Sequence, residues 1–498
     1  MNAPRELHEE LLASVRRWSR GHLDAASTEA AKTVAPELRT QLADLGLFSI
    51  TIPEEYDGTN LGLPVACEIV EELARHDRSV ATMVGLHLGL GTRAIVRGAR
   101  PELAARWLPR LARGEMIGAF AATEPNAGSD LGSIRTTLDL EGAEARLDGE
   151  KAYVTNARFA GCFTVLARTG RSHTLVLVPA DTAGVSIDGE EDKLGIRASS
   201  TATVRFDGVR LPKDHVLGEP GRGLELAYEV LGWGRTVMAA GCSGTLRDAT
   251  DRTLAHVTTR RQFKRLLIAF PAVQSAVANL RTMSDVTSAM VARTARLLER
   301  GAGESPSIAT KVFASEQAFF GCDAAIQLHG ALGVIETMGV ARLARDCRVT
   351  RIFEGANDVL LVRLGTALLA GAGGCERVGS AARPNDAARV DAMAEAIDGA
   401  IAAVRKRHGV TAIHRQGILV ALARAEVAHQ AAIAAVTHPE AMVRERLDFA
   451  LAAFEGDVRA RLDEVGRADD LAERAARACA DLTAVPSTPT GPSPLELS

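Results

Sequence analysis

Glu354 is the side chain whose surroundings best suit acid–base chemistry. It lies in the segment RIFEGAND, residues 351–358, with Ile352 and Phe353 before it and Gly355 after it. A carboxylate packed against apolar side chains is partly desolvated, which raises its pKa toward that of a useful general base. A structural role is the alternative, because DVLLVRLG predicts a helix and a carboxylate stabilises a helix N-terminus. Taken alone, the segment favours the structural role.

A second polar segment, FAATEPNAGSD, spans residues 120–130 and gathers Thr, Glu, Asn, Ser and Asp around a proline and a glycine. Such a loop presents hydroxyls and backbone N–H groups that suit a polar ring or a phosphate. A capped turn explains the same composition. The residues leave both interpretations open.

Other common catalytic patterns have little support. Gly89, Gly91 and Ala94 fit G-x-G-x-x-A, but a helical segment precedes them where a dinucleotide site needs a strand. The pattern therefore predicts a helix-breaking loop. The sequence has no H-E-x-x-H, no His/Cys cluster and no G-x-S-x-G, so metalloenzyme and hydrolase hypotheses have no anchor.

Composition predicts a large globular protein. A chain of 498 residues is expected to form about two to four domains. Apolar residues make up 47% and charged residues 24%, which excludes a disordered or fibrous chain. Aromatic residues are only 4%, so Ala, Leu and Val must build the core, and this favours helices. A net charge of −4 argues against nucleic-acid binding.

The seven cysteines indicate a reducing compartment. Their number is odd and no C-x-x-C pair occurs, so we expect reduced thiols and a cytoplasmic location. The N-terminus has early acidic residues and no apolar h-region, so neither a secretory signal nor a transit peptide is expected. No run of about 18 apolar residues predicts a membrane span.

Hydrophobic periodicity divides the chain into helical, β, helical and further helical parts. Alternating segments between residues 118 and 222 predict an antiparallel β domain, with Asp148-Gly149 as a hairpin turn. The overall expectation is an α+β fold. Its predicted parts are an N-terminal helical domain (1–117), the middle β domain (118–222), a C-terminal helical bundle (223–372), a linker (373–385), an additional helical domain (386–482) and a flexible tail (483–498).

The additional domain is predicted to contain four helices. The first carries an apolar stripe of Val390, Met393, Ile397, Ile401 and Val404. Two further helices are expected at about 413–436 and 441–465, followed by a weaker one to residue 482.

Six ordered motifs together resemble the acyl-CoA dehydrogenase family: TEPNAGSD, KAYVTN, GIRASST, TRRQF, AIQLHGALG and RIFEGAND. SITIPEEYDG and EELARHDRSVA, further toward the N-terminus, are also similar to that family. The resemblance covers roughly residues 35–370. RIFEGAND, followed by an extra helical block, is most similar to the very-long-chain branch.

The resemblance implies a helical N-terminal domain, a middle β domain and a helical C-terminal domain around FAD and an acyl-CoA thioester. It implies FAD contacts in or beside five of the six motifs. These contacts are Phe120, Ala122, Thr123, Gly128 and Ser129; Tyr153, Val154 and Thr155; Arg260, Gln262 and Phe263, which would reach the FAD of a neighbouring subunit; Gln327, Gly330 and Ala331; and Ala356 with Asp358. Substrate contacts would be Ser129, Arg235 and Gly355.

The family's catalytic base falls on Glu354, so the chemical and family interpretations converge. The base would remove the proton α to the thioester carbonyl while a hydride leaves the β-carbon for the flavin. Some branches carry the base just before the arginine of an earlier helix. Here that position is Gly234, so Glu354 has no rival and a long acyl chain has room.

Several positions depart from the family pattern. Lys264 and Pro271 replace a glycine and a glutamine near the FAD diphosphate, and Ala331 replaces a glycine. Gly232 stands where an Asn or Asp would contact CoA, with bulky Trp233 beside it, and Ala356 lacks a threonine hydroxyl. These changes are expected to weaken FAD or CoA binding or to shift the substrate.

The expected function is dehydrogenation of a medium- to very-long-chain acyl-CoA to trans-2-enoyl-CoA, with electrons passed to an electron-transfer flavoprotein. An acyl-CoA oxidase and a flavin-poor, non-catalytic scaffold are the alternatives. The additional domain is expected to dock on the core and favour a homodimer. Peripheral membrane contact through Arg405, Lys406 and Arg407 is the less favoured alternative.

Overall fold

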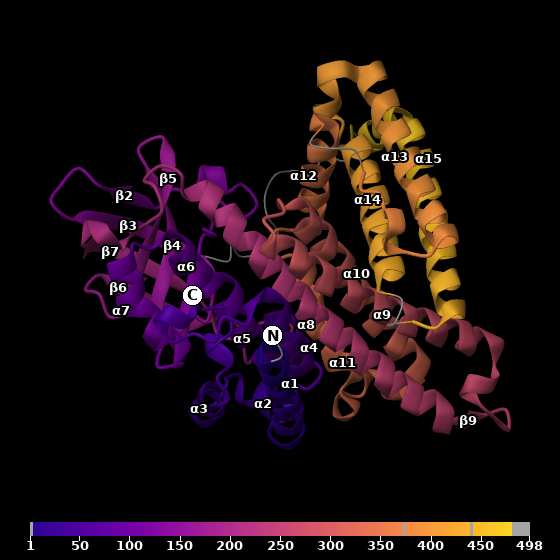
Figure 1. Ribbon diagram of the computed structural model, residues 1–498, viewed down its shortest axis with the longest axis horizontal. Helices are drawn as coiled ribbons and strands as arrows, with labels where there is room; N and C mark the ends of the chain where they lie inside the picture. The colour runs from indigo at the N-terminus through magenta and orange to yellow at the C-terminus, as the bar shows by residue number, and fades with distance from the viewer. Residues whose placement is uncertain (1–2, 372–374, 439–441, 481–498) are drawn as a thin grey trace.

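The computed structural model describes residues 3–371, 375–438 and 442–480. The predicted tail, 483–498, and the start of the predicted linker lie outside these residues. The strands occupy one side of the molecule, helices α13 to α15 the other, and the long helix α8 runs between them (Figure 1).

The N-terminal domain is helical, as predicted. Its α-helices are α1 (Ala3–His22), α2 (Ala25–Ala31), α3 (Pro36–Asp44), α4 (Gly62–Ala74), α5 (Arg78–Leu86), α6 (Arg93–Gly98) and α7 (Pro101–Ala112). Asp77 caps α5 by accepting hydrogen bonds from the backbone N–H groups of Ser79 and Val80 at 2.8 and 3.1 Å.

The Gly89–Gly91 segment is not the helix-breaking loop that the sequence predicts. It forms a π-helical turn, His87–Gly91, between α5 and α6. A Cβ on Gly91 would lie 2.4 Å from the carbonyl oxygen of Gly118, and one on Gly89 would lie 3.1 Å from the Cα of Gly234. These glycines therefore let the N-terminal domain approach the sheet and α8 closely.

The middle domain is one sheet of eight strands. They are β1 (Ile117–Ala121), β2 (Thr137–Asp139), β3 (Ala145–Thr155), β4 (Ala160–Thr169), β5 (Ser172–Pro179), β6 (Val185–Glu190), β7 (Thr201–Leu211) and β8 (Val216–Leu217). The order is β6-β7-β3-β2-β4-β5-β8, with β1 beside β4. Most pairs are antiparallel as expected, but β1 and β2 each pair with β4 in parallel. The sheet is therefore mixed.

The predicted hairpin turn at Asp148-Gly149 is wrong. Strand β3 continues through both residues, and the pairing with β7 shifts register between Leu147 and Gly149. Gly149 has φ +142°, and a Cβ there would lie 2.6 Å from the hydroxyl of Thr136. The dipeptide therefore marks a β-bulge, where glycine allows both the unusual φ and the close neighbour.

The C-terminal bundle begins with α8 (Gly223–Thr259), α9 (Pro271–Glu299) and α10 (Ser305–His329), close to the predicted segments. Strands β9 (Arg261–Gln262) and β10 (Arg265–Leu266) form a small hairpin at the far end of α8. Helices α11 (Val340–Arg348) and α12 (Asn357–Ala370) complete the bundle.

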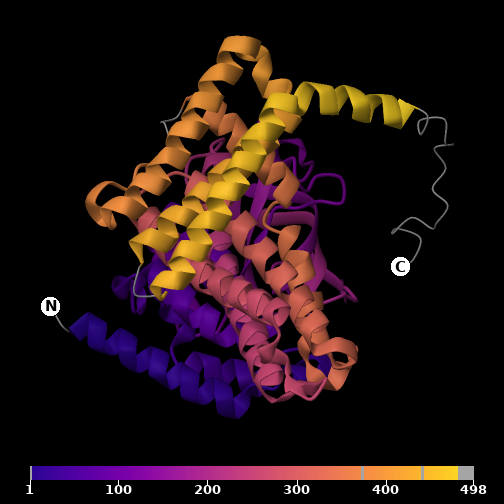
Figure 2. The same cartoon turned by 90° about the vertical axis from the view of Figure 1, so that its right-hand side faces the viewer.

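The additional domain consists of α13 (Pro384–His408), α14 (Gln416–Thr437) and α15 (Arg444–Ala480). The two helices predicted after residue 441 are one continuous α15, and no proline interrupts that segment. Figure 2 shows its C-terminal part extending away from the rest of the molecule. The domain begins at Pro384, two residues before the predicted boundary.

The docking prediction is confirmed for the additional domain. All five residues of the apolar stripe on α13 are buried, in a core shared with α9, α10, α12, α14 and α15. Arg405 donates to the backbone carbonyls of Leu368 and Leu369 at 3.0 Å and so caps the end of α12. One member of the predicted cationic cluster therefore stabilises this docking.

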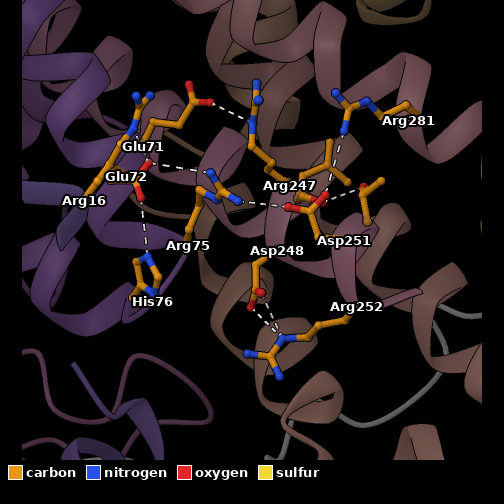
Figure 3. Close-up of polar contacts among 12 residues, drawn as sticks. Arg16, Glu71, Glu72, Arg75, His76, Arg247, Asp248, Asp251, Arg252 and Arg281 are labelled. Atoms are coloured by element: carbon orange, nitrogen blue, oxygen red, sulfur yellow. Dashed lines mark hydrogen bonds and ion pairs between the residues drawn. The ribbon is translucent and has the colours of Figure 1, made fainter. Parts of the chain in front are cut away.

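Ion pairs join the first helices to the bundle (Figure 3). Arg75, the C-cap of α4, pairs with Asp251 on α8 at 2.9 Å, and Arg247 on α8 pairs with Glu71 on α4 at 3.2 Å. Glu71 also accepts from the hydroxyl of Ser288 on α9 at 3.1 Å. The network fixes α4, which lines the cavity described below, against α8 and α9.

Two segments of the described chain, 78–98 and 416–437, are long and apolar enough to cross a membrane by length and composition alone. In the most hydrophobic 18-residue stretch of each segment, 78% of the residues of the first and 89% of those of the second are buried inside the fold. Packing within the protein therefore accounts for their hydropathy.

Candidate active site

A cavity of about 740 Å³ lies where the N-terminal helices, the sheet and the C-terminal bundle meet. Its walls come from α4, α5 and α8, from the loop after β1, from the end of β3, and from the segment between α11 and α12. Most of its exposed lining is apolar, with a few polar groups that converge on it. Such a cavity suits an apolar ligand that also needs orientation.

Glu354 lines this cavity from the turn that precedes α12. Its backbone φ of +56° is in the left-handed region, which residues other than glycine seldom adopt. Its Oε2 atom is buried and has no hydrogen-bond partner among the residues that the structure describes. A strained backbone here holds a carboxylate oxygen that is free to accept a proton from a ligand.

Two buried cations hold the Glu354 turn in place. Arg235 on α8 donates from Nε to the backbone carbonyl of Glu354 at 3.1 Å. Lys311 on α10 donates from Nζ to the carbonyl of Gly355 at 2.7 Å and to the side-chain oxygen of Asn357 at 2.8 Å. Both therefore bind the backbone of the turn and leave the carboxylate itself unpaired.

Burial raises the pKa of Glu354 to about 7 from an ordinary value of 4.5. The charges of Arg235, Lys311 and Arg78 oppose this shift without cancelling it. Burial also lowers the pKa of Lys311 to about 7, against the pull of the Glu354 charge. A carboxylate that titrates near neutral pH is suited to general base catalysis.

Gly234 provides the space that Glu354 occupies. A Cβ on Gly234 would lie 2.3 Å from Cδ2 of Leu90 and 3.1 Å from Oε2 of Glu354. The two positions at which the family can carry its base therefore converge on one point. A side chain at 234 would therefore have to displace the side chains of Leu90 and Glu354.

The loop after β1 is fixed by a second buried glutamate, Glu124. It pairs with Nζ of Lys151 at 2.8 Å and accepts from the backbone N–H groups of Arg135 and Thr136 at 2.6 and 2.9 Å. Burial acts to raise the pKa of Glu124, but the hydrogen bonds from Lys151 and Thr136 more than offset it and the pKa is lowered. The pair is structural and holds Thr123 and Ser129 at the cavity.

The structure brings part of the predicted cofactor set together at this cavity. The lining members are Phe120, Ala122, Thr123, Gly128, Ser129, Tyr153, Thr155 and Ala356. The Tyr153 side chain is 62% exposed and its φ is +56°, so an aromatic ring is presented with much of its surface uncovered. Arg235 and Gly355, two of the predicted substrate contacts, line the same cavity, as does Ser129.

The side chain of Val154 does not line this cavity. Successive residues of a strand point to opposite faces, so Tyr153 and Thr155 face the cavity while Val154 is buried in the core of the sheet.

The other predicted cofactor residues do not line this cavity. Arg260, Gln262 and Phe263 lie at the far end of α8, and Gln327, Gly330 and Ala331 at the end of α10. The two groups are close to each other, since His256 and His329 stack with ring centroids 4.4 Å apart. Phe263 is 88% exposed there. Asp358, in the first turn of α12, is exposed and also lies outside the cavity lining.

One departure from the family pattern, Trp233, has a local explanation, whereas nothing in the structure explains Gly232. Trp233 is buried in the helical core, with the guanidinium of Arg93 stacked 3.6 Å from its ring centroid, and it does not line the cavity. A Cβ on Gly232 would first meet the hydroxyl of Ser307 at 3.6 Å, so no close contact requires glycine there.

Sequence reasoning missed four charged residues. Lys311 and the Glu124–Lys151 pair are buried, and Arg78 lines the cavity. Lys311 had a recognisable signal, because it is a single charge in the apolar helical run SIATKVFA. Arg78 had none, because EELARHDRSVA is rich in charges.

Comparison with known proteins identifies the fold. Three family models match in chain order: the N-terminal domain of acyl-CoA dehydrogenases over residues 5–115, the middle domain over 119–209 and the C-terminal domain over 221–369. Cyclohexane-1-carbonyl-CoA dehydrogenase of Geobacter metallireducens is 34% identical over 341 residues, which are 67% of this chain and 90% of that protein. The chain belongs to the acyl-CoA dehydrogenase family.

Other family members differ in how much of the chain they match. Human mitochondrial very long-chain specific acyl-CoA dehydrogenase is 34% identical over 366 residues, which cover 71% of this chain but only 56% of that protein. Butyryl-CoA dehydrogenase of Megasphaera elsdenii has a TM-score of 0.71 at 28% identity and covers 73% of this chain and 98% of its own.

A Bacillus anthracis acyl-CoA dehydrogenase, solved with FAD, has a TM-score of 0.83 at 26% identity and covers 93% of this chain and 87% of its own. That match extends well past the end of the three family models, so the fold neighbour includes most of the additional helical domain.

Proposed function

We propose that this protein catalyses the FAD-dependent α,β-dehydrogenation of an acyl-CoA thioester to a trans-2-enoyl-CoA. The observation that carries the proposal is the free carboxylate oxygen of Glu354, with its raised pKa, in a cavity that also holds the residues matching the flavin motifs. Family membership supports the reaction class.

The cavity fits a flavin. The uncovered Tyr153 ring offers a flat surface, the hydroxyls of Thr123, Ser129 and Thr155 offer hydrogen bonds, and Ile352 adds apolar contact. Bound there, FAD would accept a hydride equivalent from the β-carbon of the substrate.

Glu354 supplies the base. Its Oε2 takes the proton from the α-carbon, and the C–H electron pair becomes the new π bond as the hydride leaves the β-carbon. Arg235 and Lys311 keep the turn fixed, so the backbone N–H of Glu354 can donate to the thioester carbonyl as negative charge develops on it. The apolar walls exclude water and raise the pKa of Glu354 to about 7, so the carboxylate is mostly deprotonated, and able to act as a base, above about pH 7.

An anaerobic titration tests the proposal. Acyl-CoAs of graded length should bleach the yellow holoenzyme, while Glu354→Gln should bind FAD and stay yellow. Bleaching of the Gln variant at the wild-type rate would overturn the assignment of the base. A protein that stays colourless after FAD addition would favour the scaffold alternative, for which Gly232, Ala331 and Ala356 are the supporting departures.

The finer parts of the proposal are the chain length, the electron acceptor and the assembly. Gly234 and the small residues of α5 leave room for a medium to very long chain. An electron-transfer flavoprotein is proposed as acceptor; oxygen consumption without an added acceptor would identify an oxidase instead.

A homodimer is proposed because exposed apolar side chains gather near the predicted cofactor residues at the far end of α8 and at the end of α10. They are Phe263, Leu332, Val334, Ile335 and Met338. The cysteine pattern supports the cytoplasm as the proposed location, with membrane contact at most peripheral.

A further inference from the structure

The additional helical domain contains a buried group of three side chains whose types suit a metal ion. They are Cys375, Glu426 and His429, and one ligand atom from each lies within 4.8 Å of the ligand atoms of the other two. Their exposed fractions are 8%, 6% and 0%. Among the residues that the structure describes, this is the only such group, and the proposed dehydrogenation does not use it.

The three residues come from two separate segments. Cys375 lies between α12 and α13, whereas Glu426 and His429 lie on α14. Residues three positions apart on a helix are neighbours on its surface, so α14 directs the carboxylate and the imidazole to the same side. The sequence shows no His/Cys cluster because only folding brings the thiol to this side of α14.

Hydrogen bonds hold the carboxylate of Glu426 in place. Its Oε2 atom lies 3.1 Å from Nδ1 of His429, and its Oε1 atom accepts from Nε2 of Gln430 at 2.6 Å. Gln430 is fixed in turn by Arg293 of α9, which donates to its side-chain oxygen at 2.8 Å. Each carboxylate oxygen keeps a second lone pair for a metal ion. Partners of this kind orient the ligands of protein metal sites.

The protein's own hydrogen bonds do not satisfy His429. Its Nε2 atom is buried and has no hydrogen-bond partner in the described part of the chain. When Nδ1–H donates to the carboxylate of Glu426, the lone pair of the neutral ring is on Nε2. A buried imidazole with an unused lone pair, held by a carboxylate on its other nitrogen, has the arrangement of a histidine that binds a metal.

The surroundings of Cys375 favour a cation. Burial and the negative charges of Glu426 and Asp398 raise the pKa of its thiol well above the usual range. Asp398 of α13 also accepts a hydrogen bond from the backbone N–H of Cys375 at 2.9 Å, and it pairs with Arg377 at 3.0 Å. Carboxylates beside a thiol repel the thiolate, and a divalent cation offsets this repulsion because it attracts every anion around it.

A cysteine, a histidine and a glutamate can also form a nucleophilic site. A reactive cysteine needs a thiolate that a positive neighbour stabilises, and it needs access to a substrate. The thiol of Cys375 has carboxylates beside it and a raised pKa, and all three side chains of the group are buried. The surroundings therefore favour an ion over nucleophilic catalysis.

We propose that Cys375, Glu426 and His429 bind a zinc ion. Thiolate, imidazole and carboxylate are ligands of zinc, and the soft thiolate disfavours magnesium and calcium. Bonds of about 2.0–2.3 Å place the ligand atoms of a tetrahedral zinc roughly 3.3–3.8 Å apart, so small side-chain movements close the site. The carboxylate of Asp398, beside the thiol, completes four ligands. Binding releases the thiol proton to solvent as the zinc–sulfur bond forms.

The ion would join the segment after α12 to α13 and α14. It would thereby fix the additional domain where the chain enters it from the C-terminal bundle. None of its ligands lines the cavity around Glu354, so the proposal goes beyond the proposed function and is independent of it.

Metal analysis of the full-length holoenzyme tests the proposal. After dialysis against zinc and then against metal-free buffer, the wild type should keep about one zinc ion per chain, and Cys375→Ala or His429→Gln less than about one tenth of that amount. Cys67→Ala is the matched control, because Cys67 is a buried cysteine of α4, and it should keep the wild-type amount. A wild type without zinc, or variants that keep it, would overturn the proposal.

Cobalt identifies the ligands even if a variant fails to fold. Wild-type holoenzyme loaded with Co²⁺ should show a thiolate-to-cobalt charge-transfer band in a difference spectrum against the metal-free holoenzyme, in which the flavin absorbance cancels. Cys375→Ser should lose this band, and Cys67→Ser should keep it. Absence of the band from the wild type, or its persistence in Cys375→Ser, would show that the proposed thiolate ligand is wrong.

The residue that orients Glu426 offers a graded test. Gln430→Met removes the hydrogen bond to Oε1 and should weaken zinc binding by about 10- to 100-fold in competition with a chromophoric chelator. Zinc should also raise the thermal unfolding temperature of the wild type but not that of His429→Gln. Equal stabilisation of both proteins by zinc would place the ion elsewhere and contradict the proposal. None of these measurements needs turnover, so they decide the zinc site even if the protein oxidises no acyl-CoA.

Discussion

Two glutamates that place carboxylate oxygens inside the fold, Glu124 and Glu354, have opposite surroundings. Glu124 receives a lysine and two backbone N–H groups, and its pKa is lowered. Glu354 has a carboxylate oxygen without a partner in the described chain, and its pKa is raised to about 7. Both come from short polar motifs that line one cavity. The comparison teaches that a buried carboxylate with hydrogen-bond and ion-pair partners anchors the structure, whereas one without partners remains free to react.

The backbone contributes to this difference. Cations near Glu354 donate to the carbonyl oxygens of its turn, while the cation near Glu124 donates to the carboxylate. The first arrangement fixes where the carboxylate is without neutralising it. The second neutralises the carboxylate and fixes the loop around it.

Glu354→Gln should have the largest effect. Loss of the base should lower kcat by about 10²- to 10⁴-fold, because an amide cannot take the α-proton. FAD content should be unchanged, since the amide keeps the shape of the side chain. Steady-state kinetics and flavin absorbance measure both. Glu219→Gln, at an exposed ion pair with Arg222, is the matched control. Full activity in Glu354→Gln would show that Glu354 is not the catalytic base.

Replacing one partner of the Glu124–Lys151 pair should chiefly cost stability. Glu124→Gln or Lys151→Met should lower the free energy of unfolding by about 3–5 kcal/mol, because the remaining charge stays buried without its partner. Urea denaturation measures the loss. The double variant should be more stable than the sum of the two single losses predicts. Strict additivity would show that the two groups act independently.

Gly234→Ala should lower kcat about 10-fold or more. The new methyl group would overlap Leu90 and contact Oε2 of Glu354, and overpacking of a close-packed site typically costs about 1–3 kcal/mol. Gly399→Ala, in α13 with no atom within 4 Å of the new Cβ, should keep wild-type activity. If the two variants behave alike in kinetics, the crowding at Glu354 is unimportant.

The two glutamates should respond to pH in opposite directions. Glu354 has a folded pKa of about 7 against an ordinary 4.5, so kcat/KM should rise as pH increases through about 7. The stability that protonated Glu354 contributes is lost as pH rises from about 4.5 to about 7, because the folded state binds this proton more tightly than the unfolded state does. The lowered pKa of Glu124 gives stability that is present at neutral pH and lost as pH falls through that pKa.

Unfolding free energies measured across pH test these signs. Glu354→Gln should remove the loss of stability on raising pH, and Glu124→Gln should remove the loss on lowering it. A Glu354→Gln profile that matches wild type would mean that this carboxylate is not desolvated in the folded protein.

Ala356→Thr should have the smallest effect. Ala356 is the N-cap of α12 and makes no side-chain capping bond. A threonine hydroxyl there should stabilise the helix by about 0.5–2 kcal/mol, and thermal unfolding measures it. Ala356 also lines the cavity, so FAD content is measured alongside; with FAD saturating, kcat should stay close to wild type because Glu354 and the cations that hold its turn are unchanged. A fall in stability would show that the hydroxyl does not reach the helix.

The sequence by itself determined much of this protein. The helical, β and helical order, the main bundle helices and the position of Glu354 all follow from local periodicity and ordered motifs, which depend on residues close in the chain. The same local patterns gave wrong predictions at Asp148-Gly149 and Gly89–Gly91. There, contacts with Thr136, Gly118 and Gly234, remote in sequence, decide why glycine is needed.

Only the tertiary structure decided which charges are satisfied. Arg78, Glu124, Lys151 and Lys311 look alike as charged residues in a sequence, and their roles follow from what lies beside them after folding. Local patterning specifies which faces are buried. It does not specify partners, because a hydrogen bond or ion pair depends on two positions whose separation the whole fold sets. The free carboxylate of Glu354 and the buried group of Cys375, Glu426 and His429 are results of that packing.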